Sequence, residues 1–195
     1  MKKQAYSLKK WQVIFMAFCT GLIVANIYYC QPLVVLISKE FNIAASQAGN
    51  ITFYTQIGYA SGLLFFVPLG DKIERRFQIV ATSLLACLSL TIAAFSPSIT
   101  ILRIASFCIG FTSIVPQLIL PLAAHLSPPE KRGKIIGSIM SGLLIGILLS
   151  RTFSGFIGAL LGWRSMFWIA AIITGTLMII MRFVFPENKV HYQGN

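Results

Sequence analysis

The chain has 195 residues, of which 56% are hydrophobic and 11% charged, and its mean hydropathy is +0.80. Soluble domains carry about 25% charged residues, so this composition excludes a soluble globular domain and favours a bilayer as the solvent. The net charge of +11 does not indicate a nucleic-acid partner, because the basic residues form short clusters between apolar runs and no basic face with interleaved aromatics is present.

Six apolar runs follow one another along the chain, and each is long enough for a helix that crosses a bilayer, which takes about 20 residues. Lipid cannot satisfy bare backbone groups, and runs that are apolar on all sides predict helices rather than barrel strands. We therefore predict an all-α membrane protein, a six-transmembrane-helix bundle over residues 11–186 with tails at 1–10 and 187–195. Its spans are expected at about 11–37, 47–70, 78–96, 99–123, 135–161 and 165–185.

Lysine and arginine are distributed unequally between the two sides that these spans define. Twelve lie in the tails, in the loops after the second and fourth spans, and at the end of the sixth span. Lys39 and Arg164 lie on the other side, whereas Arg103 and Arg151 fall within spans. The positive-inside rule therefore predicts that both termini are cytoplasmic.

The loop after the second span carries Asp71, Lys72, Arg75 and Arg76. Residues 67–76 resemble the loop motif Gly-x-Leu-Ala-Asp-Arg-x-Gly-Arg-Arg of the major facilitator superfamily, in the place where that family has it. Two of the motif's glycines are replaced here, by Val67 and Glu74. The charges of this loop either form a cytoplasmic latch or only anchor the topology, and the sequence leaves both open.

Other segments resemble the same family. Residues 26–33 are similar to the first span of its bacterial drug or sugar efflux branch, Arg103 resembles its intramembrane arginine, and 162–167 resemble the opening of its sixth span. Residues 142–155 align with its antiporter motif, whose Gly-Pro is Ser150-Arg151 here. The resemblance covers the N-terminal half of a twelve-span transporter. It implies a secondary transporter, of efflux type, in a bacterial inner (plasma) membrane.

Small residues recur at every fourth position of the fifth predicted span, namely Gly142, Gly146, Ser150, Ser154 and Gly158. Helical periodicity places them on one ridge, and small residues let another helix approach closely. In the family that this chain resembles, this helix borders the other half of the transporter. We expect tight packing along the ridge rather than contact with a solute.

Two arginines lie within predicted spans. Arg151 is about 24 Å from the cytoplasmic end, at 1.5 Å per residue, and a charge at that depth faces a cavity or a partner. It is a candidate for substrate binding or coupling, or for a structural role. Arg103 is only about four residues inside its span and can reach the surface. Since none of the five acidic residues is mid-membrane, the arginines favour an anionic or neutral polar solute.

Polar residues within the spans are further candidates for a solute cavity. They are Asn26, Tyr28, Tyr29 and Gln31 before Pro32 in the first span, Tyr54, Gln56 and Tyr59 in the second, and Gln117 between Pro116 and Pro121 in the fourth. Proline bends a spanning helix and frees carbonyls, and transporter sites collect such broken helices near the midplane. A single Tyr or Gln can instead serve as a hydrogen bond between helices.

We expect neither an enzyme, nor a metal site, nor a cofactor, because no catalytic or metal-spaced motif is present and the four cysteines lie inside apolar runs. Two hypotheses remain. The first is a transporter whose partners are the lipid bilayer, a small-molecule solute and a second six-span half or a homodimer. The second is an inactive truncated fragment or a partner-dependent membrane interaction module, because one half cannot alternate access alone. The substrate, direction and coupling ion stay open.

Overall fold

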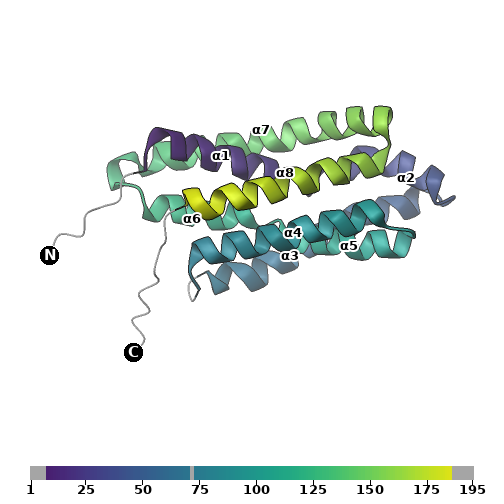
Figure 1. The fold of residues 1–195 in the computed structure, drawn as a ribbon, viewed down its shortest axis with the longest axis horizontal. Helices are drawn as coiled ribbons and strands as arrows, with labels where there is room; N and C mark the ends of the chain where they lie inside the picture. Colours follow the sequence, from purple (N-terminus) through teal and green to yellow (C-terminus); the bar gives the residue numbers. More distant parts are fainter. Residues whose placement is uncertain (1–7, 71–72, 186–195) are drawn as a thin grey trace.

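The computed structural model describes residues 8–70 and 73–185, and the regular structure within those ranges is helical. Figure 1 shows the helices lying along one common direction, with the start of α1, the start of α7 and the end of α8 at the same end. In chain order the helices are α1 (Lys10–Ala25), the 3-10 helix η1 (Gln31–Leu33), α2 (Val34–Glu40), α3 (Ala45–Leu69), α4 (Arg75–Phe95), α5 (Ile99–Thr112), α6 (Val115–His125), α7 (Pro129–Leu161) and α8 (Trp163–Val184).

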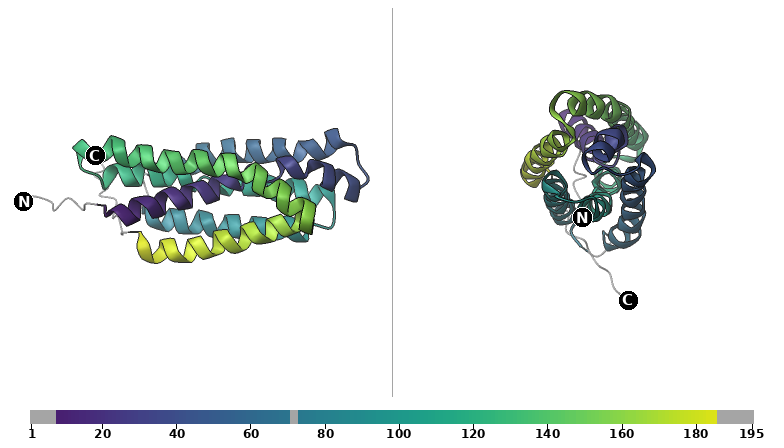
Figure 2. Two further views of the ribbon diagram at one scale, coloured as in Figure 1. Left: turned by 90° about the horizontal axis from the view of Figure 1, so that it is seen from above. Right: turned by 90° about the vertical axis from the view of Figure 1, so that its right-hand side faces the viewer.

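Four of the described helical segments are long and apolar enough to cross a bilayer, namely Arg75–Phe95, Ile99–His125, Pro129–Leu161 and Trp163–Val184. Helix α8 begins one residue after α7, with Gly162 between them, and the two helices run in opposite directions (Figure 2). Helix α1 is apolar but has only 16 residues, and the 25-residue α3 carries more polar side chains. Several crossing helices in one chain make this a multi-pass membrane protein.

Two of the expected spans are interrupted. The segment 11–37 is divided by turns over residues 26–30 and by η1, and the segment 99–123 is divided at residues 113–114. Each interruption lies next to a proline, since Pro32 is in η1 and Pro116 is in the first turn of α6. Proline has no N–H and its ring crowds the carbonyl of the preceding turn, so a helix breaks on its N-terminal side.

Helices α3 and α5 touch backbone to backbone along a seam of glycines. A Cβ atom on Gly58 would lie 2.1 Å from the carbonyl oxygen of Phe107, and one on Gly110 would lie 2.0 Å from that of Thr55. Gly62 repeats the contact one turn further along α3. No side chain fits at these distances, so glycine is what permits the close approach.

Helices α1 and α7 form a second seam and run in the same direction. A Cβ on Gly142 would lie 2.5 Å from the carbonyl oxygen of Ala17, and one on Gly146 would lie 2.2 Å from that of Gly21. The small-residue ridge of α7 is therefore occupied by the first helix of the same chain. The end-on view in Figure 2 shows α1 beside α7.

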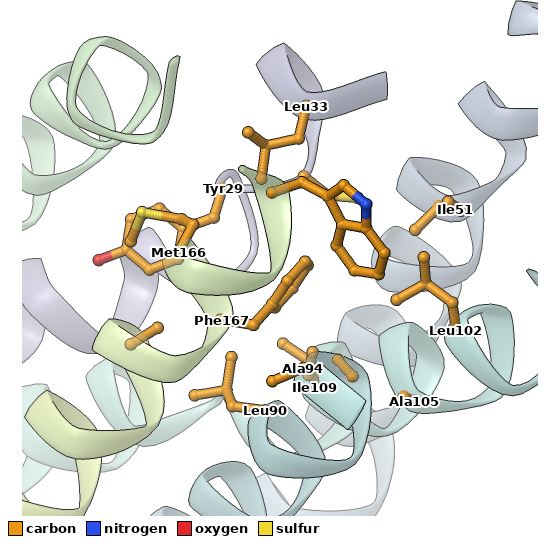
Figure 3. Close-up of a cluster of buried hydrophobic side chains, with 14 of the residues drawn as sticks. Tyr29, Leu33, Ile51, Leu90, Ala94, Leu102, Ala105, Ile109, Met166 and Phe167 are labelled. Atoms are coloured by element: carbon orange, nitrogen blue, oxygen red, sulfur yellow. The ribbon is translucent and has the colours of Figure 1, made fainter. Parts of the chain in front are cut away.

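Apolar side chains fill the bundle near both of its ends. One cluster lies at the end far from α1's first turn, where Phe167 and Met166 of α8 meet Leu90 of α4 and Leu33 of η1 (Figure 3). A second cluster lies at the other end and includes Met16, Ile79, Leu122, Ile139 and Met181. Each cluster draws on most of the helices, so the bundle is held together across its whole width.

Arg164, at the start of α8, joins three segments at the end where α2 stops. Its guanidinium donates to a carboxylate oxygen of Glu40, and to the carbonyl oxygen of Ser96 at 2.9 Å. The indole N–H of Trp163 donates to the other Glu40 oxygen, and the guanidinium carbon lies 4.2 Å from the Trp163 ring centroid. Desolvation alone would raise the pKa of Glu40, but the hydrogen bonds from Arg164 and Trp163 and the guanidinium charge hold that pKa below its usual value.

The glycine seam predicts opposite effects for one substitution at two positions of α3. Gly58→Ala places a methyl group against the Phe107 carbonyl and should lower the free energy of unfolding by about 1–3 kcal/mol. Gly49→Ala is the matched control, because a Cβ there meets no atom within 4 Å, and it should be neutral or slightly stabilising. Thermal unfolding in detergent measures both. Equal melting temperatures for the two variants would contradict the seam.

The Glu40–Arg164 pair predicts a pH-dependent stability. Because the folded-state pKa of Glu40 is lowered, the pair stabilises the fold above the ordinary glutamate pKa of about 4.3, and this stabilisation is lost as the pH falls through the lowered value. Both side chains are partly exposed, so we expect at most about 1 kcal/mol from a cycle of Glu40→Gln, Arg164→Gln and the double variant. Melting temperatures at pH 7 and pH 3 measure it. A coupling as large at pH 3 as at pH 7 would be inconsistent with this pair as the source.

Candidate functional site

A cation of α7 faces an aromatic ring from the turn that follows α1. The guanidinium carbon of Arg151 lies 5.7 Å from the ring centroid of Tyr28, within the range of a cation–π interaction. Arg151 is exposed and Tyr28 is half-buried. The turn places Tyr28 here because its N–H bonds to the carbonyl oxygen of Ala25 at 2.9 Å, which closes the last turn of α1 more tightly.

Two more polar side chains meet beside Tyr28. The amide nitrogen of Gln117 on α6 donates to the hydroxyl of Tyr59 on α3 at 3.1 Å. Tyr28 and Tyr59 both pack against the small apolar cluster of Val24, Ile27 and Leu143, and both remain partly exposed. We call the set Tyr28, Tyr59, Gln117 and Arg151 the polar face.

The polar face offers a fixed positive charge, two phenol groups and an amide. Arg151 can pair with a carboxylate or phosphate, and it donates in a planar fork. The phenols and the amide both donate and accept hydrogen bonds, and the rings present flat apolar surfaces. These groups can bind an anionic or neutral polar molecule. Among residues 8–70 and 73–185, no three His, Cys, Asp or Glu side chains lie close enough to hold a metal ion.

Three other candidates from the first interrupted segment, and Gln56 from the second predicted span, are not part of the polar face. Asn26 is buried, and its side-chain nitrogen donates to the hydroxyl of Thr174 on α8 at 3.2 Å. Tyr29 is buried in the apolar cluster of Figure 3, one residue from Tyr28 but on the opposite side of the turn. Gln31 is half-buried at the start of η1, and Gln56 is exposed on α3. Among the described residues, none of these four forms a hydrogen bond or a cation–π pair with Arg151.

Arg103 belongs to a different part of the molecule. It lies in the second turn of α5 and donates to the carbonyl oxygen of Gln47 at the start of α3, at 3.1 Å. With Tyr54 it lines a pocket of about 280 Å³ between α3 and α5. Its Nε is buried and has no partner among the described residues. The two intramembrane arginines of the sequence therefore occupy two separate environments.

The charged loop motif is described only in part. Asp71 and Lys72 lie outside the described residues. Arg75 and Arg76 open α4, and both are half-buried. The next turn of α4 carries a contact that the sequence did not indicate, since the side-chain nitrogen of Gln78 donates to the carbonyl oxygen of Phe66 near the end of α3. This bond ties the two helices together on either side of the loop.

The small residues of α7 contact the first helical segments along their whole length. Beyond the glycine contacts with α1, the hydroxyl of Ser154 donates to the carbonyl oxygen of Tyr29 at 2.5 Å. A Cβ on Gly158 would lie 2.3 Å from a methyl group of Leu33 in η1. Ser150 is buried and its hydroxyl donates to the carbonyl oxygen of Ile147. These positions pack helices and do not contribute to the polar face.

Several residues that organise the site had no clear sequence signal. Nothing in the sequence around Thr174 indicates that its hydroxyl accepts a hydrogen bond from Asn26. Gly58 and Gly62 do have the four-residue spacing of a close helix contact, and this spacing was the signal that could have revealed the α3–α5 seam. That seam positions Tyr59, which follows Gly58 directly.

The family model described as Major Facilitator Superfamily matches residues 13–194. The chain is 44% identical over 189 residues to the uncharacterized transporter YgaY of Escherichia coli O157:H7, covering 97% of this chain and 48% of the relative. It is 24% identical over 177 residues to the purine ribonucleoside efflux pump NepI of Escherichia coli K12, covering 90% of this chain and 44% of NepI. The chain thus spans about half the length of the curated relatives it matches.

Solved structures share the fold. A bacterial homologue of the human lysosomal transporter Spinster, crystallised in an inward-facing and unoccupied conformation, superposes with a TM-score of 0.81 at 14% sequence identity. The superposition covers 97% of this chain and 45% of that one. At this identity the likeness concerns the arrangement of the helices alone.

Chemical labelling distinguishes the polar face from the surfaces that adjoin lipid. In a background where Cys19, Cys30, Cys87 and Cys108 are replaced by serine, Gln117→Cys should react with a water-soluble methanethiosulfonate reagent in reconstituted membranes. Leu149→Cys, on an apolar surface of α7, should react at least ten-fold more slowly, because thiolate forms poorly without water. The labelling rates measure this contrast. If Gln117→Cys reacted as slowly as Leu149→Cys, water would not reach the polar face.

Proposed function

Because the chain belongs to the major facilitator superfamily, we propose that it forms the N-terminal six-span half of a secondary transporter in a bacterial inner membrane, with both termini in the cytoplasm. The first span would run from α1 into α2 and end near residue 37, before Glu40. The other five would be α3, α4, α5 to α6 taken together, α7 and α8. The distribution of lysine and arginine supports this orientation.

We propose that the polar face is this half's share of the solute site. The observation that carries the proposal is the pairing of exposed Arg151 with Tyr28, about two thirds of the way along the 33-residue apolar helix α7. A charge there is costly in lipid and is retained where it faces a water-filled cavity. Tyr59 and Gln117 reach the same face from two further helices, so four separate segments converge on one place.

The chemistry of the polar face favours a small polar solute that is anionic or neutral. A guanidinium repels organic cations, and no carboxylate lies among the four residues to attract them. Flat phenol rings and an amide suit a planar molecule that forms hydrogen bonds. NepI is named as an efflux pump for purine ribonucleosides, which have these properties, and the similarity to it supports export as the direction.

A second six-helix bundle is needed to complete the site. In this superfamily two parallel repeats rock about a central site, and solute is released when the access side changes. Arg151 is exposed in the part of the chain that the structure describes, which is consistent with a second bundle covering this face. We propose that this bundle is a C-terminal half or a second copy of the chain.

Transport by everted membrane vesicles, prepared from cells that express the chain in its native genomic context, tests the proposal. The vesicles are offered radiolabelled inosine, an organic anion and tetraphenylphosphonium. We expect accumulation of the first or second, and at least a ten-fold loss in Arg151→Gln, because one charge-assisted hydrogen bond contributes about 1.5–3 kcal/mol. Arg182→Gln, an exposed arginine at the end of α8, is the matched control and should transport normally.

Two results would overturn the assignment. Accumulation of tetraphenylphosphonium alone would contradict the charge preference of the polar face. Unchanged transport by Arg151→Gln, with normal amounts of protein in the membrane, would remove Arg151 from the site.

A further inference from the structure

A long apolar groove lies between α1 and α7, away from the polar face. It has a volume of about 460 Å³, and its walls include Ile14, Phe18 and Leu22 of α1 with Ile145, Leu149 and Phe153 of α7. Its floor is the glycine seam, where Gly21 meets Gly142 and Gly146, and Ile173 of α8 closes one side. The small floor residues leave the space that larger side chains would otherwise fill.

The groove is about as long as the acyl-chain region of one leaflet, which is half of a hydrocarbon core about 30 Å thick. Its lining on α1 extends from Ile14 to Ala25, which is about 16 Å at 1.5 Å per residue. The walls are exposed apolar side chains, since Phe18 is 58% and Leu149 is 57% accessible. In a membrane protein, an exposed apolar groove parallel to the helices lies along the lipid tails.

Helical spacing places two lysines beyond the end of the groove that is nearest the first turn of α1. On α1, Lys10 lies four residues before Ile14 and therefore on the same side of the helix. On α7, Lys134 lies eleven residues, about three helical turns, before the groove residue Ile145, so it is on the same side of that helix. Ala17 contacts Gly142, and the two helices run in parallel, so seven and eight residues back from this contact place Lys10 and Lys134 at the same level.

We propose that the groove binds one phospholipid with an anionic headgroup. One acyl chain lies over the glycine seam, and Lys10 and Lys134 bind the phosphate beyond that end of the groove. Both lysines are exposed, and a Cβ on Gly137, one turn beyond Lys134, meets no atom within 4 Å, so space for a headgroup is present. Basic residues between spanning helices at the membrane surface are suited to such headgroups. This inference does not depend on transport.

The test measures lipid retained on the whole purified chain. Native mass spectrometry in a neutral detergent follows titration with phosphatidylglycerol or with zwitterionic phosphatidylcholine. We expect one tightly held phosphatidylglycerol per chain, and weaker phosphatidylcholine. Lys10→Gln/Lys134→Gln should weaken phosphatidylglycerol binding about five-fold for each lysine and abolish the preference. Arg182→Gln is the charge control, because position 182 is nine residues from Ile173, which is half a turn away around α8.

A second pair of variants tests the groove itself. Ile145→Trp fills it from the wall and should reduce retention of both lipids, whereas Leu144→Trp, which is equally exposed but outside the groove, should not. Equal retention of the two lipids by the wild-type chain would overturn the proposed headgroup site. So would an equal loss in Arg182→Gln and the double lysine variant, and equal effects of the two tryptophans would exclude this groove.

Discussion

Backbone atoms of neighbouring helices touch at two seams, α3 with α5 and α1 with α7, and both depend on glycine. In a bilayer, helices gain little from hiding apolar side chains against one another, because the surrounding tails are equally apolar. Close packing and interhelical hydrogen bonds must hold the pairs together instead. The seams also position the polar face, since Tyr59 follows Gly58 in one seam and Arg151 comes five residues after Gly146 in the other.

Residues around the circumference of α7 face three different environments. Consecutive residues of a helix point about 100° apart, so neighbours in sequence reach different environments. Leu149 lines the apolar groove, Ser150 is buried in the α1 seam, and Arg151 faces Tyr28. A shift of the helix by one residue would bring the guanidinium into the buried seam. The tight glycine contacts exclude that shift, and they therefore keep the charge on the open side.

The sequence was sufficient for the helical membrane class and for the family, because hydropathy and the loop motif are local signals. It also gives Tyr28, Gln117 and Arg151 individually as candidates. It could not determine which polar residues face each other, since Tyr28 and Tyr29 differ only in the side of a turn on which they lie. It gives no sign that the side chain of Asn26, a cavity candidate, bonds to Thr174, which is 148 positions away. Such pairings depend on how helices rotate against one another, and single residues do not encode that rotation.

The ridge of α7 changes from glycine to serine along its length, and the shape of its partner explains why. Where α1 is a regular helix, its carbonyl groups are used internally, so Gly142 and Gly146 need only allow contact. After Ala25 the chain leaves the α-helix, and a carbonyl group that loses its helical partner there needs another donor, because water is absent. Ser154 lies at that level and donates to the freed Tyr29 carbonyl. The break that presents Tyr28 to Arg151 is thus stabilised by the helix that carries Arg151.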